Sequence, residues 1–443
     1  DYFEIDGHNE KAIFKSLKKV QKAKKPSVIS CKTKIGYGSP NKSGKASSHG
    51  SPLGLDEINL VRKKLNWKYK PFEIPTEILA IWRDTGKNGE KENVKWQKRY
   101  HKKKNKIKKY FANNFKSIFE NEKKDIVKNI QPLASRKASE KILTSLTKVD
   151  TALIGGSADL AGSNNTKTKN QKIIKTNNFA GNYIHYGVRE HAMCGIMNGI
   201  SLHSGLVPYG GTFLIFSDYC KPSIRLSALM QQRVIYVMTH DSIGLGEDGP
   251  THQPIEQIEG LRAIPNLNVF RPADTTETYE CWQLALENYN TPSVLALTRQ
   301  NLEPIRKDYI KENKCALGAY EVFRSNQNIM LVIFASGSEV NLAIKVSHKL
   351  AMENIYSKVI SVPCQELFDK QTEVYKNNIL NEANFAITIE AGSTNSWHKF
   401  VKNKGLNFGI DEFGKSAPYN EIYNYFGLTV ENIVIKTKNL IKN

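Results

Sequence analysis

The sequence predicts consecutive α/β domains with mostly parallel sheets. From about residue 130 onward, stretches with helical periodicity alternate with short apolar runs of the kind that form buried strands. A second series of such runs follows Cys315, and each run leads into a turn or a helix. Because neighbouring parallel strands need a crossover connection, usually a helix, this alternation indicates sheets that are covered by helices. A length of 443 residues suits roughly two to four domains.

The beginning of the chain carries a shorter version of this pattern. A helix is predicted over residues 10–25 and a strand over residues 27–31, and a Gly-rich loop runs from Gly36 to His49. The stretch from Lys87 to Lys128 is rich in Lys and Asn and poor in Gly and Pro, which favours helices with solvated faces. We expect this basic stretch to connect the first segment to the middle of the chain.

The apolar runs define the predicted strands and domains. The runs in the middle of the chain cover residues 152–154, 183–186, 234–238, 267–270 and 294–297, and those in the last part cover residues 330–335, 358–362 and 385–389. The predicted domains are residues 1–104, which include the start of the basic linker, residues 105–314 and residues 315–443. Each of the last two domains is expected to hold a sheet of its own.

The chain carries a formal net charge of +21. Clustered Lys and Arg side chains can bind nucleic acid, because they release counterions from the phosphates. Much of the excess lies in one stretch, however, and no RRM, KH, zinc-finger or helix-turn-helix motif accompanies it. A lysine-rich composition without function, or attraction of small phosphorylated metabolites, explains the charge better. No nucleic-acid partner is therefore predicted.

Composition also indicates where the protein resides. No run of about 18 apolar residues is present, so neither a membrane span nor a membrane partner is predicted. The first residues, DYFEIDGHNEKAIFK, lack the basic and apolar regions of a signal peptide. The 6 cysteines occur singly, without a CxxC pair or zinc-ligand spacing, which indicates reduced thiols in the core. We therefore expect a cytoplasmic protein.

Polar residues follow the predicted strands of the middle domain. In open α/β sheets, ligands bind beyond the carboxyl ends of the strands, so these residues are expected to share one rim. The rim comprises Asp159, Ser163, Glu190, His240, Asp248, His252 and Arg299. Together with Arg136 it suits a phosphorylated, polyhydroxylated substrate, because guanidinium groups pair with phosphate and imidazoles exchange protons with hydroxyls. Each residue alone also fits an ordinary turn or helix cap.

Two glycine motifs are not expected to bind nucleotides. The segment from Gly244 to Gly249 spells GxGxxG, but it carries two carboxylates where a pyrophosphate would lie, and it leads into PTHQP rather than a clean helix start. The stretch from Gly38 to Ala46 resembles a P-loop. It has one residue too many between the glycines, and Ala46 offers no hydroxyl to a magnesium ion.

Several longer segments resemble the transketolase family in order and spacing along essentially the whole chain. They are CKTKIGYGSPNKSG followed by SHGSPLG, LASRKAS, GGSADLAGSN, GNYIHYGVREH, PYGGTFLIFSDY and HDSIGLGEDGPTHQP. The last segment, residues 240–254, is the most specific. Deoxyxylulose phosphate synthases and phosphoketolases, which are related thiamine enzymes, remain the alternative within the same cofactor class. A basic nucleic-acid-binding protein is the alternative outside it.

The resemblance implies a thiamine-diphosphate-binding fold and a C-terminal transketolase-like α/β domain without catalytic residues. The implied reaction is the reversible transfer of a two-carbon ketol unit between sugar phosphates in the pentose phosphate pathway. The donor would be xylulose 5-phosphate, fructose 6-phosphate or sedoheptulose 7-phosphate, and the acceptor ribose 5-phosphate, erythrose 4-phosphate or glyceraldehyde 3-phosphate. The implied cofactors are thiamine diphosphate and a magnesium or calcium ion. The family is homodimeric, with each active site between two subunits.

The resemblance also assigns cofactor-binding residues. Glu190 matches the family's glutamate that hydrogen-bonds to the aminopyrimidine of the cofactor and promotes deprotonation of the thiazolium C2. This role requires a buried carboxyl with a raised pKa, and the alternative is a structural ion pair with Arg189. Phe213, Phe216 and Tyr219 match the aromatic pocket for the pyrimidine ring, although their spacing of three also favours an ordinary buried helix face.

Further matches concern the substrate. Arg136, Ser163, His240 and Arg299 fall on the family's positions around the sugar phosphate, where the two arginines would be bidentate clamps. Asp248 matches the residue that recognises a substrate hydroxyl near C2 and so gives the family its stereochemical preference.

Two histidines and one aspartate complete the implied site. His252 and His49 match histidines that contact substrate hydroxyls near the reacting carbon and move protons, so that with Glu190 they form the catalytic set. His49 also matches a residue close to the cofactor's diphosphate, and Asp159 one in the cofactor's surroundings at the dimer interface. Ala46 stands where many relatives carry another histidine.

The family's GDG motif and its downstream asparagine, which carry the metal ion and the diphosphate, have no match in the chain. The early pair Asp6-Gly7 is not expected to replace them, because it lacks the motif's preceding strand and following asparagine. We therefore expect the sequence to lack the family's N-terminal third. The metal ligands would lie in that region, and the chain on its own would be inactive.

Overall fold

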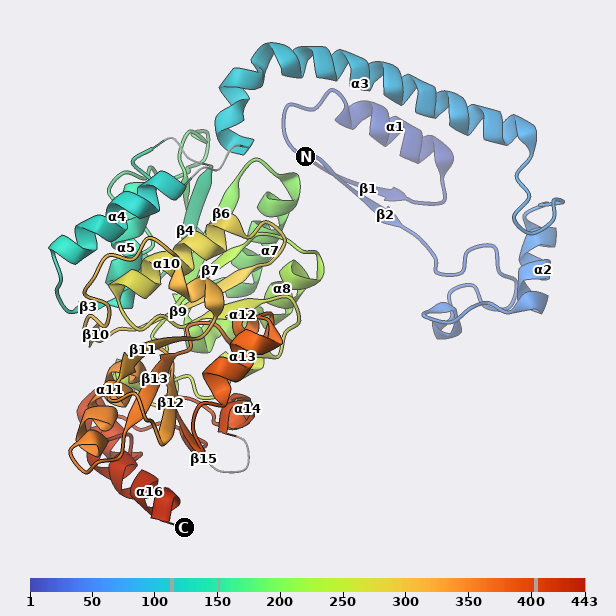
Figure 1. Ribbon diagram of the computed structural model, residues 1–443. Helices are drawn as coiled ribbons and strands as arrows, with labels where there is room; N and C mark the ends of the chain where they lie inside the picture. Colours follow the sequence, from blue (N-terminus) through green and yellow to red (C-terminus); the bar gives the residue numbers. More distant parts are fainter. Residues whose placement is uncertain (112–114, 150–151, 402–404, 443) are drawn as a thin grey trace. The chain divides into compact units, whose positions relative to one another are not determined.

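Figure 1 shows the chain as a computed structural model, which describes residues 1–111, 115–149, 152–401 and 405–442. The chain divides into two compact units, Asp1–Lys103 and Lys104–Asn443. His49 lies in the first unit, and every other candidate site residue lies in the second. None of the helices in the described ranges is both long enough and apolar enough to cross a membrane.

The first unit opens with a βαβ crossover. β1 (Tyr2–Asp6) pairs in parallel with β2 (Val28–Lys32), and α1 (Glu10–Val20) connects them. The helix begins where it does because the Asn9 side chain accepts a hydrogen bond from the backbone N–H of Ala12. A glutamate in the first turn and lysines in the last turn suit the helix dipole.

Three details of this crossover differ from the sequence expectations. The helix ends at Val20 rather than continuing to Lys25. β1 was not predicted, and because it ends at Asp6, the Asp6-Gly7 pair does follow a strand. Cys31 is exposed, so the prediction of core thiols is wrong for this cysteine, although the other cysteines are buried and unpaired.

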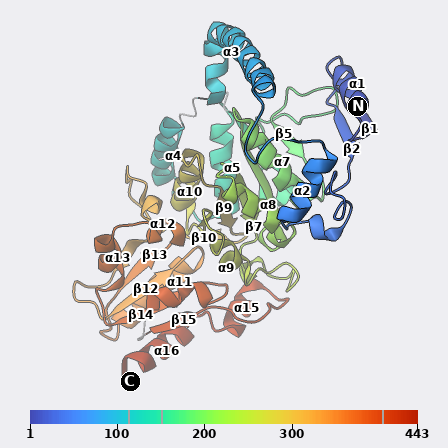
Figure 2. The same cartoon turned by 90° about the vertical axis from the view of Figure 1, so that its right-hand side faces the viewer.

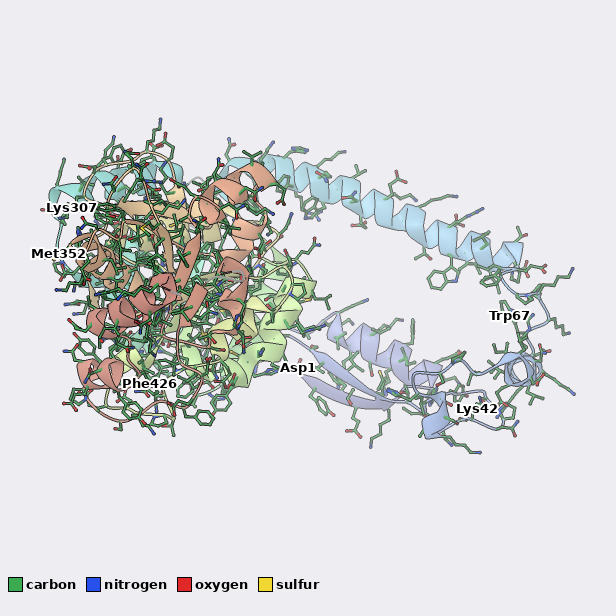
Figure 3. The ribbon with its side chains drawn as sticks, turned by 60° about the horizontal axis from the view of Figure 1, so that its bottom comes forward. Asp1, Lys42, Trp67, Lys307, Met352 and Phe426 are labelled. Carbon is green, nitrogen blue, oxygen red and sulfur yellow. The ribbon has the colours of Figure 1, made fainter. Side chains whose placement is uncertain are left out.

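The basic stretch folds as two helices, α3 (Thr76–Phe111) and α4 (Lys116–Lys128). Along α3 the described side chains are exposed or at most half-buried, as expected of solvated faces, and Figure 3 shows them as sticks. In α4, however, Lys123 is only 5% exposed, and its Nζ forms an ion pair of 2.6 Å with Glu280. The prediction of a solvated face is therefore wrong for this lysine, whose charge is balanced by a buried carboxylate.

A six-stranded sheet in the order β5-β4-β6-β7-β9-β8, with parallel neighbours throughout, forms the first half of the second unit. Its strands are β4 (Leu153–Ser157), β5 (Tyr183–His185), β6 (Val207–Phe213), β7 (Ile235–Thr239), β8 (Asn268–Phe270) and β9 (Ser293–Leu297). All were predicted except β6, whose sequence VPYGGTF contains a proline and two glycines. Close packing requires the glycines: a Cβ on Gly210 would lie 2.6 Å from Met197 Sδ.

Helices cover both faces of this sheet, as Figure 1 shows. They are α5 (Ser135–Leu146) and α10 (Thr275–Glu287), together with α7 (Glu190–His203) and α8 (Ser217–Leu229). Val237 and Leu295 belong to the core that α5 and α10 share with the sheet, whereas Tyr236 and Val294 belong to the core under α7 and α8. Burial on both faces explains why the strands appear in the sequence as continuous apolar runs.

The second half holds a five-stranded sheet in the order β11-β13-β12-β14-β15, in which only β11 is antiparallel. Figure 2 labels β12, β13, β14 and β15 of this sheet. Its strands are β11 (Tyr320–Arg324), β12 (Leu331–Ala335), β13 (Ser357–Ser361), β14 (Phe385–Ile389) and β15 (Gly405–Phe408). The helices α11 (Glu339–Ala351) and α16 (Val430–Lys442) pack on one face. The three central strands were predicted, and the two edge strands, whose apolar runs are weaker, were not.

Candidate active site

The carboxyl ends of neighbouring strands bring three candidate residues to one edge of the six-stranded sheet. Phe213 is the last residue of β6, His240 directly follows β7, and Arg299 lies just after β9. Since β6, β7 and β9 are parallel neighbours, their carboxyl ends meet at this edge, which is where α/β sheets bind ligands.

Buried hydrogen bonds fix the position of His240. Asn164 Oδ1 accepts from Ser157 Oγ at 3.1 Å, and its Nδ2 donates to Thr239 Oγ1 at 2.7 Å. Thr239 Oγ1 lies 2.9 Å from Nδ1 of His240. Because the Thr239 hydroxyl accepts from Asn164, its own proton is free for Nδ1, which favours the His240 tautomer protonated at Nε2. Asn164 and Thr239 were missed at the sequence level, where the only signal was their position beside candidate residues.

Arg136 reaches the same edge from the first turn of α5. Its Nη1 donates to the carbonyl oxygen of Ser163 at 2.8 Å, and its Nε is buried without a hydrogen-bond partner among the described residues. Burial and the nearby Arg299 guanidinium lower the pKa of Arg136. Two neighbouring cations, one with an unused buried N–H, suit a bound anion such as a phosphate.

Arg299 is the more solvated of the two arginines. Its side chain is 42% exposed, and its Nη1 donates to the Leu245 carbonyl and lies 3.8 Å from a carboxylate oxygen of Glu247. These contacts tie Arg299 to η3 (Ile243–Leu245) and the turn that follows it. The guanidinium therefore lies at the open side of the site, where solvent screens its charge more than that of Arg136.

The His240 ring lies inside the site. The residue is 4% exposed, and its ring centroid is 3.9 Å from that of Phe213. Burial, and then the positive charges of Arg136, Arg299 and His252, lower the pKa of His240 to about 3. A histidine that stays neutral at physiological pH can hydrogen-bond to a hydroxyl without carrying charge.

We expect this depressed pKa to make the protein less stable in acid. The unfolded chain protonates His240 near the ordinary value of 6.5, whereas the folded chain keeps it neutral down to about 3. His240 therefore costs no stability above pH 6.5, where it is neutral in both states, and lowers the free energy of unfolding by up to about 1.4 kcal/mol per pH unit as the pH drops from 6.5 toward 3. Urea unfolding at about pH 7.5 and 5.5 should show a smaller drop for His240→Asn than for the unsubstituted chain. Equal drops would contradict the assignment.

Three aromatic rings form a stacked row that leads from the interior to the surface. The centroids of Phe213 and Phe216 are 5.6 Å apart, and those of Phe216 and Tyr219 are 5.7 Å apart. The exposed fraction rises from 8% at Phe213 to 64% at Tyr219. The row follows the end of β6, η2 (Leu214–Phe216) and the first turn of α8, so its interpretation as an ordinary buried helix face is wrong. Its exposed end offers a flat surface on which a heterocycle can stack.

His252 lies beside this row, edge-on to two of its rings. Its ring centroid is 5.6 Å from that of Phe216 and 6.1 Å from that of Phe213. Gln253 holds the loop in place, because its Nε2 donates to the carbonyls of Gly246 and Lys415 at 2.9 Å each. The loop therefore places an imidazole beside the aromatic row, near the Phe213 ring that His240 also contacts.

The same loop contains Asp248 and the GxGxxG segment. Gly246 and Gly249 adopt φ angles of 90° and 76°, so the chain makes two left-handed turns here instead of entering a helix. The interpretation that this segment is not a nucleotide-binding loop agrees with this geometry. Asp248 is exposed.

Glu190 is the first residue of α7 and is 8% exposed. α7 packs against α8 and against β6, which are the elements that carry the aromatic row. The guanidinium of Arg189 donates to the Tyr186 carbonyl at 3.0 Å, and in the described ranges no ion pair joins it to Glu190. The structural alternative for this glutamate, pairing with Arg189, is therefore not what the structure shows.

Two candidate residues have no described contact with this cluster. Asp159 is exposed just after β4 and has a left-handed φ of 63°. His49 is exposed in the first unit, where it ends η1 (Ala46–Ser48). Their roles stay predictions.

Family models match three successive parts of the chain. Residues 2–124 match the thiamine diphosphate binding domain of transketolase, residues 131–304 its pyrimidine binding domain, and residues 318–429 the transketolase-like C-terminal domain. Among solved structures, transketolase from Leishmania mexicana is 37% identical with a TM-score of 0.88, over 100% of this chain and 66% of that one. Transketolase from Campylobacter jejuni is 34% identical with a TM-score of 0.88, over 99% and 67%.

The transketolase of Rhodobacter capsulatus is 42% identical to the chain over 455 residues, which cover 100% of this chain and 68% of the relative. The chain belongs to the transketolase family. The transketolase of Sinorhizobium medicae is 43% identical over 447 residues, which cover 99% of this chain and 64% of the relative. The chain thus spans about two thirds of the length of these transketolases.

The residues present fit the pyrimidine part of the cofactor that the transketolase family implies. All candidate residues except His49 fall within the part matched by the pyrimidine binding domain. There, Phe216 and the exposed ring of Tyr219 provide a stacking surface, and Glu190 provides a buried carboxyl on a helix that packs against the same elements. For a metal ion, the described ranges contain no group of three or more His, Cys, Asp or Glu side chains that could hold one.

Proposed function

We propose that this chain catalyses the transketolase reaction, the reversible transfer of a two-carbon ketol unit from a ketose phosphate to an aldose phosphate. One observation carries the proposal: two arginines and a neutral, buried histidine meet at the sheet edge that also begins the aromatic row. A phosphate, sugar hydroxyls and a flat heterocycle are the ligand groups that these side chains recognise. Family membership supports the same reaction.

The proposed cofactor is thiamine diphosphate, with a magnesium or calcium ion. When bound, the cofactor supplies the nucleophilic carbon that carries the two-carbon unit between sugars. Phe213, Phe216 and Tyr219 would hold its pyrimidine ring, and Glu190 would share a proton with a ring nitrogen in a site with little water. His49 and Asp159 are proposed to lie near the cofactor.

The substrate roles follow from position and charge. Arg136 and Arg299 would bind the phosphate, Ser163 would add a donor, and the Nε2–H of His240 would donate to a sugar oxygen. His252, next to Phe216, would take and return a hydroxyl proton near the reacting carbon. Asp248 would accept a hydrogen bond from a substrate hydroxyl near C2. His49 would accept one from a hydroxyl close to the reacting bond.

We further propose a homodimer that forms through α7 and α8. The apolar side chains that these helices and the short segment before α7 expose are Val188, Ile196, Leu202, Tyr219, Leu226 and Leu229. Gly195 and Gly199 also face outward, because a Cβ added at either would have no atom of another described element within 4 Å. An apolar surface with glycines one helical turn apart suits close contact with another helix pair.

Substituting Ile196 by Lys should disrupt this dimer, because the charge would be buried at the contact. Light scattering coupled to size-exclusion chromatography should give a dimer for the unsubstituted chain and a monomer for Ile196→Lys at micromolar concentration. Val374→Lys is the matched control, since Val374 is a 72% exposed apolar residue on α13 (Glu373–Leu380). Dissociation by both variants, or a monomeric unsubstituted chain, would contradict the proposed interface.

The remaining assignments are proposals as well. Unpaired cysteines agree with a cytoplasmic location, where thiols stay reduced, and the reaction would belong to the pentose phosphate pathway. We also propose the domain boundaries at residues 104 and 314.

The function itself is tested with a chimera in which this chain replaces its aligned residues in the Rhodobacter capsulatus transketolase. Formation of sedoheptulose 7-phosphate from xylulose 5-phosphate and ribose 5-phosphate, dependent on added thiamine diphosphate, is expected; a folded chimera without this activity would count against it.

A further inference from the structure

Arg271 lies at the centre of a buried charge cluster where the two halves of the second unit meet. The residue directly follows β8 and is 0% exposed. Its Nε donates to Asp241 Oδ2 at 2.9 Å, and its Nη1 donates to the Ser336 carbonyl at 2.9 Å and to Glu339. One guanidinium thus joins a loop of the first sheet to the loop and helix that follow β12 in the second sheet.

Asp241 connects this cluster to the candidate active site. It follows His240 directly, is 1% exposed, and has a second oxygen, Oδ1, without a hydrogen-bond partner in the described residues. His240 adopts a φ of 60°, a conformation that a non-glycine side chain rarely takes, so its neighbours have to hold it. Thr239 anchors the residue on one side, and the Asp241–Arg271 ion pair anchors it on the other.

The loop after β12 encloses the guanidinium. The N–H of Gly337 donates to the Arg271 carbonyl at 3.0 Å, and Ser338 Oγ accepts from Nη2 at 3.2 Å. Gly337 has a φ of 54°, and a Cβ there would lie 2.8 Å from the Cγ and Cζ atoms of Arg271. Only glycine lets the loop close on the arginine in this way.

The place that Arg271 occupies is one where α/β sheets usually bind ligands. From β12, the chain runs to β13 on one side of it and then returns to β14 on the other, so the topological switch point lies between β12 and β14. Ser336 follows β12 and Glu390 follows β14. Glu390 accepts two hydrogen bonds of 2.8 Å from Arg262, so arginines of the first sheet's domain fill the crevice.

We propose that Arg271 is a positioning residue for the substrate-binding His240. Residues that follow β12 hold the Arg271 guanidinium, and Arg271 in turn holds Asp241. Asp241 thereby fixes the backbone turn and the ring orientation at His240. This gives the C-terminal part of the chain an influence on the active site without a catalytic residue of its own. The inference rests on the proposed function only in so far as His240 binds substrate. A purely structural ion pair between the two halves is the alternative.

Arg262 provides a matched control. Its side chain is only 5% exposed and bridges the same two halves, through Glu390. It makes no described hydrogen bond or ion pair with Asp241. Arg262→Lys should therefore weaken the contact between the halves without moving His240, whereas Arg271→Lys should do both, because lysine keeps the charge but not the planar fork.

The test is a pair of measurements on the full chain labelled with ¹⁵N-histidine, in which the His240 ring signals are assigned from their loss in His240→Asn. We expect Arg271→Lys to shift or broaden these signals at fixed pH and temperature, and Arg262→Lys to leave them in place. Gly337→Ala, whose added Cβ would lie 2.8 Å from the Cγ and Cζ atoms of Arg271, should also shift or broaden these signals, and it replaces Arg271→Lys should that variant not fold. Binding of ribose 5-phosphate should weaken about tenfold in Arg271→Lys, as when the outer partner of a metal-binding histidine is lost.

The two measurements separate this inference from the proposed function. His240 signals that stay in place in Arg271→Lys and Gly337→Ala, with thermal stability lowered as in Arg262→Lys, would overturn the positioning role and leave a structural ion pair. Absence of ribose 5-phosphate binding by the unsubstituted chain, with the His240 signals responding as expected, would count against the substrate role of His240 and not against its coupling to Arg271.

Discussion

Glu190→Gln is expected to lower kcat for ketol transfer by about 10²- to 10⁴-fold, the usual contribution of a general acid or base. The glutamine keeps the size of the side chain and its place at the start of α7, but it cannot exchange a proton with a pyrimidine nitrogen. Because Glu190 is 8% exposed, water does not easily take over its role. Rates measured in the chimera at saturating substrates test this expectation directly.

The control for this substitution is Glu373→Gln. Glu373 begins α13, as Glu190 begins α7, but its side chain is 80% exposed. The control variant should keep the full rate, and circular dichroism should show both variants folded. A folded Glu190→Gln variant with more than a tenth of the original kcat would leave Glu190 without its proposed role.

Arg136→Ala should lower kcat/KM for phosphorylated sugars by about 10- to 150-fold, which corresponds to the roughly 1.5–3 kcal/mol typical of hydrogen bonds to charged groups. The reason is its position: Nη1 is fixed by the Ser163 carbonyl, and Nε is buried without a described partner. A phosphate would use these N–H groups, and the partial burial would strengthen the contact. The measurement compares kcat/KM for ribose 5-phosphate and for unphosphorylated ribose as acceptors. Only the value for ribose 5-phosphate should fall.

Two further variants define the cause of that loss. Arg136→Lys keeps the positive charge but not the planar guanidinium with its paired N–H donors. Its kcat/KM for phosphorylated sugars should therefore lie between the values of the alanine variant and the unsubstituted protein. Arg233→Ala removes another partly buried arginine, whose Nη1 donates to the Leu286 carbonyl at 2.8 Å, and should leave the ratio of the two acceptors unchanged. An equal loss for both acceptors in Arg136→Ala would indicate a structural rather than a phosphate-binding role.

Much of the fold could be predicted from the sequence, because its central parallel strands are buried on both faces. The runs at β7, β9 and β12 are continuously apolar for this reason. β6 was not predicted because its two glycines and its proline oppose strand formation locally. Only the packing of Met193 and Met197 against Gly210 shows why a glycine is needed there. The burial of Lys123 was not predicted because its ion-pair partner, Glu280, lies far away along the chain.

The candidate site was predicted in part, for a similar reason. Residues at the carboxyl ends of parallel strands, such as His240 and Arg299, meet by topology, and topology follows from the strand pattern. The orientation of His240 could not be predicted, since it depends on Asn164 and Asp241, whose partners come from other strands. The spacing of the aromatic row also allowed a buried helix face, because a spacing of three does not show where a strand changes to a 3₁₀ turn.

Following the transferred carbons tests the central claim most directly. The chimera is given xylulose 5-phosphate labelled with ¹³C at C1 and C2, together with ribose 5-phosphate, glyceraldehyde 3-phosphate and pyruvate, and the products are identified by NMR. A two-carbon ketol transferase should place both labelled carbons together at C1 and C2 of sedoheptulose 7-phosphate and leave pyruvate untouched. Consumption of pyruvate with release of carbon dioxide, or label in acetyl phosphate when inorganic phosphate is present, would contradict the claim and point to one of the related thiamine enzymes.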